Sequence, residues 1–254
     1  MARIDLNADV GESFGAWAMG ADAELLALVT SANVACGFHA GDPTVMDRTV
    51  ALAARAKVAI GAHPSHPDLR GFGRRAIQAD PVDIERDVIY QIGALQAFAR
   101  THGTRVVHVK PHGALYNQAA EDEAVARAIA RGVARVDAKL ILVGLASTAV
   151  MRRAAEAEGL RFAAEAFADR RYTPKGTLVS RREPGAVLSD PAQAAAQAVK
   201  IATEGRVRAS DGTEVELRAD TLCLHGDNPA AVANAAAVRR ALESAGVAVR
   251  SLDV

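Results

Sequence analysis

Ionisable and amide side chains recur along this chain where short β-branched runs end. In chain order they are Asp9 and Glu12, Asn33 and His39, His63, Lys110 and His112, Glu165 and Asp169, and His225 and Asp227. Carboxylates and imidazoles accept and release protons in catalysis, and a lysine beside carboxylates binds an anionic group or carries a proton. Their positions predict one polar site for acid–base chemistry on a small molecule.

The first residues of the chain show this pattern most clearly. Residues 3–10 alternate like a strand, with Ile4, Leu6 and Ala8 on one face and Asp5, Asn7 and Asp9 on the other. Carboxylates and an amide are unfavourable when buried without partners. This polar face therefore either meets water or forms part of a site.

Short strands alternate with longer, alanine-rich helical patterns along the whole chain. The predicted strands are 3–9, 32–37, 58–63, 105–110, 139–144, 161–167 and 219–225, with a further one at 247–252. The predicted helices are 22–30, 43–57, 81–102, 121–136, 147–158, 190–204 and 229–245. Four Asx-Pro pairs, at 42–43, 80–81, 190–191 and 228–229, predict helix starts, with the Asx side chain as the N-cap.

This repeated order of strand and helix predicts a parallel sheet with helical crossovers. A closed barrel and an open doubly wound sheet both satisfy it. The barrel is favoured because single strand faces mix small, apolar and polar residues, as in Val106, His108 and Lys110, whereas an open sheet buries both faces in aliphatic runs. We expect one α/β domain over 1–254, a TIM-like (β/α) barrel with an irregular insertion at about 168–188. Barrel enzymes build their sites at the carboxyl ends of the strands.

Composition narrows the class of protein. The chain has 254 residues, a formal net charge of zero and two cysteines, Cys36 and Cys223. The balanced charge gives no indication of a nucleic-acid or membrane partner, and two cysteines are too few for a disulfide framework. No P-loop or H-E-x-x-H motif occurs, and the G-x-G-x-x-A letters at 71–76 do not join a strand to a helix. A cytoplasmic protein is expected.

Several of the polar residues also have structural interpretations. Asp42 is expected to be a helix N-cap, and Asp227 fits either capping or function. His39 lies in a glycine-rich turn where backbone can approach a ligand, which favours function. His102 is expected to end a helix, and His108 to be a hydrogen-bonded core residue.

Two further groups keep two interpretations each. Lys110 fits an ion pair with Asp5 or Asp9 as well as substrate binding, and the two are compatible. The arginines of the insertion, Arg170 among them, are by default a solvated charged loop, but beside a carboxylate-rich site they could clamp a carboxylate or phosphate.

Seven segments resemble the LamB/YcsF family. They are residues 5–12 (DLNADVGE), 33–43 (NVACGFHAGDP), 61–65 (GAHPS), 71–75 (GFGRR), 109–117 (VKPHGALYN), 165–170 (EAFADR) and 225–227 (HGD). The chain departs from the family pattern at His66 and Lys175, which argues against His66 as a ligand. The resemblance implies a barrel, often seven-stranded, akin to polysaccharide deacetylases. It also implies ATP-dependent cleavage of 5-oxo-L-proline to L-glutamate together with B and C subunits.

For that reaction the residues receive the following roles as hypotheses. Asp9 or Glu12 is the base that deprotonates water, and His39 or His63 is the acid that protonates the ring nitrogen. Lys110 and Arg170 bind a carboxylate or phosphate. The substrate is oriented, or a divalent ion held, by Glu165, His112, His225 and Asp227, and Asn7 and Asn33 complete the substrate site. Without a nucleotide loop here, ATP, with its Mg²⁺, is expected to be bound wholly or partly by the partner subunits. The metal content and any self-association are left open.

Two other classes fit the same residues. One is a stand-alone, metal-dependent deacetylase or amidohydrolase on the same barrel. The other is a non-catalytic subunit that binds a lactam or a sugar. The number of ionisable groups favours an enzyme.

Overall fold

Seven parallel strands close into a barrel in the computed structural model, which describes residues 2–180, 183–224 and 230–252. They are β1 (Arg3–Val10), β2 (Ser31–Ala35), β3 (Ala59–His63), β4 (Val106–Val109), β5 (Ile141–Leu145), β6 (Arg161–Phe167) and β9 (Thr221–Leu224). Neighbouring strands pair in that order, and β9 pairs with β1 to complete the ring. The predicted barrel and its seven strands are confirmed.

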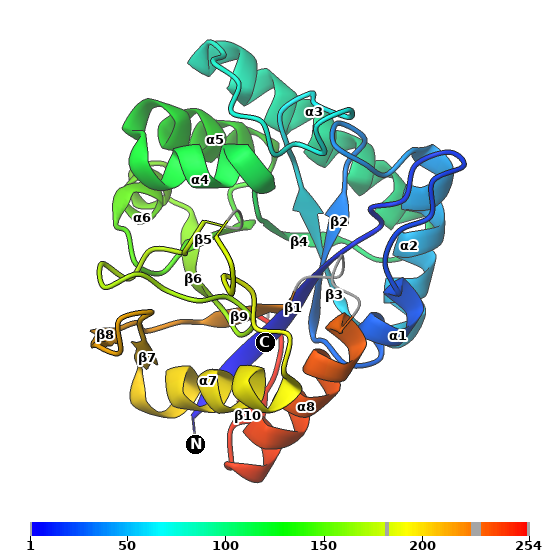
Figure 1. The fold of residues 1–254 in the computed structure, drawn as a ribbon. Coiled ribbons are helices and arrows are strands. Elements are labelled where there is room, and N and C mark those ends of the chain that lie inside the picture. The colour runs from blue at the N-terminus through cyan, green and yellow to red at the C-terminus, as the bar shows by residue number, and fades with distance from the viewer. Residues whose placement is uncertain (1, 181–182, 225–229, 253–254) are drawn as a thin grey trace.

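Helices surround the strands on the outside of the barrel (Figure 1). They are α1 (Asp22–Leu26), α2 (Pro43–Ala56), α3 (Pro81–Thr101), α4 (Gly113–Glu121), α5 (Glu123–Val136), α6 (Val150–Ala157), α7 (Pro191–Glu204) and α8 (Ala231–Ser244). Each helix buries an apolar stripe. On α3 this stripe is Ile84, Val88, Ile92, Leu95 and Ala99, all buried as their helical spacing predicts.

Three of the predicted Asx-Pro pairs start helices, with the aspartate as the N-cap. Asp42, Asp80 and Asp190 each accept a hydrogen bond from a backbone N–H in the first turn, and a proline follows each of them. These bonds satisfy donors that have no partner within the helix. The fourth predicted cap, at Asn228-Pro229, lies outside the described residues.

Four elements differ from the sequence-based expectation. The predicted helix at 121–136 is preceded by a separate helix, α4, and Asp122 caps α5 at the break between the two. The strands β7 (Arg206–Arg208) and β8 (Glu214–Glu216) form an antiparallel hairpin that was not predicted. With three residues each, they are too short for an alternating pattern to be recognised. The helix α1 ends at Leu26 rather than at residue 30.

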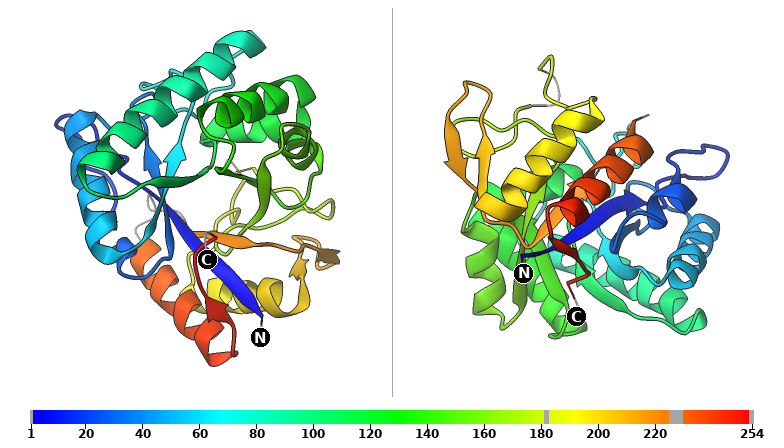
Figure 2. Two further views of the ribbon diagram at one scale, coloured as in Figure 1. Left: turned by 180° about the vertical axis from the view of Figure 1, so that it is seen from behind. Right: turned by 90° about the horizontal axis from the view of Figure 1, so that it is seen from below.

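The last predicted strand is present but short. β10 (Ala248–Val249) pairs with Arg3 and Ile4 at the start of β1. The two ends of the described chain therefore lie side by side, at one end of the barrel (Figure 2). Leu252 follows and packs with Ile141, Val143 and Ala163, which gives this end of the barrel a small apolar cluster.

The insertion between β6 and α7 is irregular, as predicted. Its described residues form no named strand or helix, only isolated bridges such as that between Tyr172 and Leu178. Arg170 and Tyr172 within it are buried. The segment therefore packs onto the barrel at the end of β6.

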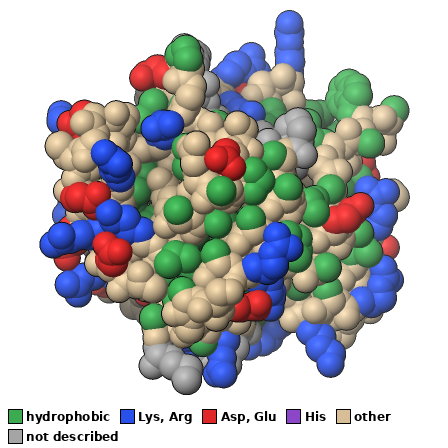
Figure 3. Space-filling model, turned by 60° about the horizontal axis from the view of Figure 1, so that its bottom comes forward, with side chains coloured by type: hydrophobic (Ala, Val, Ile, Leu, Met, Phe, Trp, Pro, Cys, Tyr) green, Lys and Arg blue, Asp and Glu red, His purple; other side chains and the backbone are tan. Residues whose placement is uncertain are grey.

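The outer surface mixes both signs of charge, and Figure 3 shows Lys and Arg interspersed with Asp and Glu on one face. In the described ranges, none of the helices combines the length and the apolar character needed to cross a membrane.

The interior of the barrel is narrow where β2, β3 and β4 meet. A Cβ atom at Gly61 would lie 2.0 Å from Nε2 of His108, and that nitrogen donates a 2.8 Å hydrogen bond to Oδ1 of Asn33. Gly61→Ala is therefore expected to displace His108 and to lower the free energy of unfolding by about 1–3 kcal/mol. Urea denaturation measures this change.

Gly93→Ala is the matched control for Gly61→Ala. Gly93 lies within α3, and a Cβ there would meet nothing within 4 Å. Alanine in a helix is favoured over glycine by roughly 0.5–1 kcal/mol, so this variant should be at least as stable as the parent. If Gly61→Ala were as stable as Gly93→Ala, the predicted clash between a Cβ atom at Gly61 and His108 would be wrong.

Candidate functional site

The polar residues that follow the barrel strands converge on one buried site. Asp9 lies on β1 and Glu12 just after it, His39 follows β2, His63 ends β3, Lys110 and His112 follow β4, and Glu165 lies on β6. All seven are buried, with at most 8% of each residue exposed. Parallel strands bring their carboxyl ends to the same end of a barrel, so residues far apart in the chain become neighbours.

Lys110 lies between two carboxylates. Its Nζ atom is 2.9 Å from Oδ1 of Asp9, 2.9 Å from Oε1 of Glu165 and 3.0 Å from Sγ of Cys223. Burial acts to lower the pKa of Lys110, but the negative groups outweigh it, and the pKa lies well above its usual range. Lys110 is therefore a fixed ammonium group. Of the two expected ion-pair partners, Asp9 is correct and Asp5 is not.

Two asparagines inside the barrel form hydrogen bonds with these charged groups. Asn33 Nδ2 donates to Oδ1 of Asn7 at 2.7 Å and to Oδ1 of Asp9 at 2.8 Å. Asn7 Nδ2 donates to Oε1 of Glu165 at 3.1 Å and to Oγ1 of Thr221 at 2.7 Å. Both asparagines are buried, and this network fixes the carboxylates of Asp9 and Glu165 in place.

Asp5 lies one layer deeper, where hydroxyl groups surround it. Thr30, Ser31 and Thr221 donate to its carboxylate at 2.7, 2.7 and 2.5 Å. Burial raises the pKa of Asp5 to about 6, although these hydrogen bonds act in the opposite direction. Below about pH 4 this carboxyl is protonated in both the folded and the unfolded chain.

The raised pKa of Asp5 predicts that the chain becomes less stable as the pH rises. Between about pH 4 and pH 6 the folded chain holds a proton that the unfolded chain releases, so the contribution of Asp5 to stability falls as the pH rises through this window. The raised pKa corresponds to about 3 kcal/mol. We expect the free energy of unfolding of the parent, relative to that of Asp5→Asn, to decrease by about this amount from about pH 4 to about pH 7. Denaturant titrations of both proteins measure it, and a constant difference would contradict it.

Three imidazoles and Glu12 form the other half of the site. Oε1 of Glu12 is 3.5 Å from Nε2 of His39 and 3.5 Å from Nδ1 of His112. Nδ1 of His112 is 3.0 Å from Nε2 of His63, and Nε2 of His63 is 3.4 Å from Oδ2 of Asp9. Burial, together with the neighbouring imidazoles, lowers the pKa of His39 and of His112 well below the usual range. These two rings are therefore neutral near neutral pH.

These four side chains also satisfy the spatial requirement for a metal site. The potential ligand atoms of Glu12, His39, His63 and His112 all lie within 4.8 Å of one another. Imidazole nitrogen and carboxylate oxygen suit divalent transition metals. The cluster could therefore hold a metal ion.

The site opens into a cavity of about 620 Å³. Asp9, Glu12, His63, Lys110 and His112 line it, together with Arg74, Tyr116, Phe167, Arg170 and residues 177–180 of the insertion. Arg74, Lys110 and Arg170 supply positive groups to a lining that also carries the carboxylates of Asp9 and Glu12. The volume of the cavity suits a metabolite-sized molecule.

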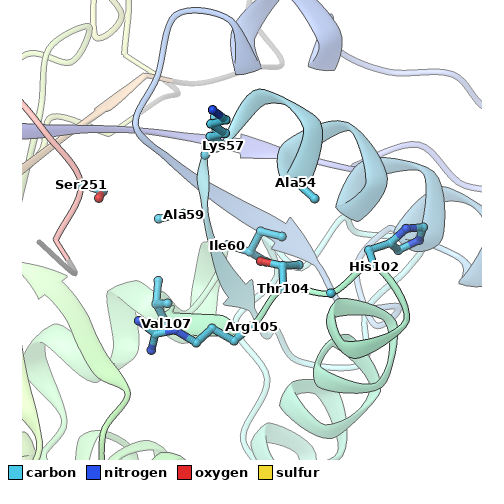
Figure 4. Close-up of a pocket in the computed structure, with 11 residues that line it drawn as sticks. Ala54, Lys57, Ala59, Ile60, His102, Thr104, Arg105, Val107 and Ser251 are labelled. Carbon is cyan, nitrogen blue, oxygen red and sulfur yellow. The ribbon is translucent and has the colours of Figure 1, made fainter.

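A second cavity, of about 440 Å³, lies at the opposite end of β3 and β4 (Figure 4). It is lined by Lys57, His102 and Arg105 among others, and by the first residues of β3. It contains none of the clustered carboxylates or imidazoles described above. The site predicted from the strand ends is therefore the first cavity.

The remaining candidates lie elsewhere. His66 is 2.8 Å from Oε1 of Gln118, and His102 caps the end of α3 and pairs with Asp47. Asp42 is an N-cap. Asp169 is buried next to Arg170 at the start of the insertion. His225 and Asp227, both expected in the substrate site, lie outside the described residues.

Several residues at the site were not among the sequence-based candidates, and three of them carry polar groups that bear on its chemistry. Arg74 and Tyr116 line the cavity, and Cys223 contacts Lys110. Arg74 and Tyr116 lie within segments 71–75 and 109–117 of the family resemblance, which was the available signal. Cys223 shares a strand face with Thr221, but nothing in the sequence links it to Lys110.

The LamB/YcsF family model matches residues 4–254. The A subunit of 5-oxoprolinase from Methylococcus capsulatus is 58% identical over 253 residues, which are 99% of this chain and 97% of that protein. The solved lactam utilization protein of Thermus thermophilus is 51% identical with a TM-score of 0.93, over 98% of this chain and 100% of that chain.

A more distant likeness concerns the fold alone. A polysaccharide deacetylase from Bacillus cereus superposes with a TM-score of 0.50 at 12% identity, over 99% of this chain and 92% of that one. The barrel is thus shared with deacetylases, as the sequence resemblance implies. With the family model matching nearly every residue, the chain belongs to the LamB/YcsF family.

Proposed function

We propose that this chain is the A subunit of a 5-oxoprolinase, which opens the lactam of 5-oxo-L-proline to give L-glutamate at the expense of ATP, together with B and C subunits. One observation supports it above the others. Lys110, held between Asp9 and Glu165, faces the same cavity as the imidazole cluster, in a chain that matches the A subunit of a 5-oxoprolinase over almost its whole length.

The chemistry of a lactam explains why such groups are needed. An amide carbonyl is a poor electrophile, and phosphorylation of its oxygen by ATP creates a better leaving group. Water must then be deprotonated, the ring nitrogen must gain a proton, and the charge that develops on oxygen must be stabilised. A base, an acid and fixed cations have to surround one small ligand.

Asp9 is the base in this proposal. Its Oδ1 atom is held by Lys110 and Asn33, while its carboxylate faces the cavity beside His63. Glu12 is the alternative base, since it lines the same cavity. The proton donor is His63, which lines the cavity, rather than His39, which does not.

The cations bind the anionic parts of the substrate. Lys110, as a permanent ammonium group, and Arg170 lie where a carboxylate or phosphate would enter. Glu165 and the asparagines Asn7 and Asn33 position Lys110 and Asp9 from below. His112 orients the substrate or holds an ion, and His225 and Asp227 keep the same role as hypotheses.

ATP, with Mg²⁺, is assigned to the partner subunits because this chain has no nucleotide-binding loop motif. Isothermal titration of the purified chain with MgATP should therefore give no stoichiometric binding. Tight binding at one nucleotide per chain would contradict this assignment and would place activation of the lactam on this chain.

The proposed function is tested by reconstitution. The chain is incubated with 5-oxoproline and ATP, with and without purified B and C subunits, and glutamate formation is measured. We expect glutamate only when all the subunits and ATP are present. No glutamate from the complete mixture would reject the proposal.

The clustered Glu12, His39, His63 and His112 favour one alternative, a stand-alone metal-dependent amidohydrolase. That enzyme would hydrolyse an amide without ATP or partner subunits and would lose activity on chelation. The same reconstitution, with ATP omitted, distinguishes the two functions.

A further inference from the structure

Two imidazoles of the site face each other through nitrogens that both carry lone pairs. Nδ1 of His63 is 2.7 Å from the carbonyl oxygen of Lys110, and Nε2 of His112 is 2.9 Å from that of Phe72. A carbonyl only accepts, so each of these nitrogens carries the ring proton. In neutral rings the remaining nitrogens, Nε2 of His63 and Nδ1 of His112, are both unprotonated, yet they lie 3.0 Å apart.

Two lone pairs at this distance repel each other unless a cation compensates them. The two residues are only 1% and 4% exposed, so bulk water does not separate the two nitrogens. A divalent ion satisfies both lone pairs at once. It also attracts the nearby carboxylate of Glu12, whose Oε1 atom is 3.5 Å from Nδ1 of His112.

We propose that Glu12, His63 and His112 form a binding site for one divalent transition-metal ion of the zinc type. In a tetrahedral site with bonds of about 2.1 Å, the ligand atoms are about 3.4 Å apart. The observed separations of 3.0 Å between the two nitrogens and 3.5 Å to Glu12 lie close to that value. The potential ligand atoms of all three residues lie within 4.8 Å of one another, so side-chain adjustment brings them to a common ion.

The second coordination shell supports this choice of ligands. A histidine that binds a metal almost always donates its other ring N–H to a carbonyl or carboxylate, which fixes the tautomer and the orientation of the ring. His63 and His112 both do so. Among the described residues, neither ring nitrogen of His39 has a hydrogen-bond partner.

The geometry also excludes His39 as a ligand in this arrangement. Its ring stacks on that of His112 with centroids 3.7 Å apart and an angle of 4° between the planes. An imidazole binds a metal in its own plane, so two parallel rings cannot both point at one ion. The rings of His63 and His112 are instead at 89° to each other, which lets their lone pairs converge.

Three protein ligands leave a fourth position for water or substrate, which is typical of catalytic rather than structural zinc sites. Glu12, His63 and His112 all line the cavity, so that position faces it. In the proposed reaction the ion would polarise the lactam oxygen. Only this catalytic role of the ion, and not its binding, rests on the proposed function. With the ion bound, His63 would be a ligand in place of the proton donor assigned above, and Asp9, beside it, would pass the proton taken from water to the ring nitrogen.

The test measures binding of the ion itself. The purified chain is stripped with a chelator, dialysed and titrated with Zn²⁺, and with Mg²⁺ for comparison, by calorimetry. We expect one Zn²⁺ per chain, weaker binding of Mg²⁺, and a rise in the unfolding temperature on Zn²⁺ binding. Co²⁺ bound in place of Zn²⁺ should give the visible absorption of a four-coordinate site. No stoichiometric Zn²⁺ binding to the folded parent chain would overturn the proposal.

Variants identify the ligands. His63→Gln, His112→Gln and Glu12→Gln should each weaken Zn²⁺ binding by at least about 100-fold, while circular dichroism shows that they remain folded. His39→Gln and the control His66→Gln, which changes a buried histidine outside the cluster, should bind Zn²⁺ like the parent. Unchanged affinity in both His63→Gln and His112→Gln, measured on folded protein, would reject the site.

Binding and turnover separate the two proposals. A chain that binds no ion but forms glutamate with its partner subunits would overturn only the metal site. A chain that binds Zn²⁺ through these residues but never supports glutamate formation would overturn only the proposed function.

Discussion

Replacing Lys110 with methionine is expected to lower kcat for glutamate formation by the reconstituted enzyme about 10³-fold. The ammonium group contacts both Asp9 and Glu165, at 2.9 Å from each. Without it, two buried carboxylates face each other and the substrate loses a fixed positive charge. The free energy of unfolding should fall by about 3–5 kcal/mol, because a buried charge loses its partner.

Two further variants make the result for Lys110 interpretable. Lys200→Met removes a lysine that pairs with Glu214 on the surface, and it should change both turnover and stability little. Lys110→Arg keeps the positive charge, so it should remain folded, but its longer side chain does not fit between the carboxylates and turnover should still fall. Turnover close to that of the parent in folded Lys110→Met would remove this residue from the mechanism.

Asp9→Asn is expected to reduce kcat by about 10²–10⁴-fold, since an amide cannot accept the proton of the attacking water. The shape of the side chain is retained, and its oxygen can still accept hydrogen bonds from Lys110 and Asn33, which now lie near Oδ1. The measurement is glutamate formation with B and C subunits at saturating 5-oxoproline, with the folded state checked by circular dichroism.

The control is Asp47→Asn, which removes a half-exposed carboxylate that pairs with His102 outside the cavity. It should leave turnover unchanged. If folded Asp9→Asn forms glutamate at nearly the parental rate, the assignment of the base to Asp9 is wrong.

Much of the fold could be predicted because its determinants are local. Asp42, Asp80 and Asp190 cap helices through bonds to residues only two or three positions ahead, so a short segment of sequence carries the whole signal. The stripe on α3 follows from helical geometry alone. The helix α4 and the hairpin of β7 and β8 were missed because short elements contain too few residues for a period to emerge.

The site was less predictable. The strand-end residues could be named, but Asp9 and Lys110 are 101 positions apart, and their contact depends on how the ring of strands closes. The sequence left Asp5 and Asp9 as equal partners for Lys110. The structure places Asp5 among hydroxyl groups deeper in the barrel than Asp9, since the two residues are four positions apart on one face of the same strand.

The amino-acid sequence by itself determined the order of strands and helices, the barrel, the family and the set of ionisable residues at the strand ends, because caps, periodicity and motifs act over a few residues. Only the tertiary structure decided which of these groups touch. It separated the cavity-lining His63 and His112 from His39, and Asp9 from Asp5. Distances, burial and ring orientation arise from long-range packing, and these quantities set the charge state and the chemistry of each group.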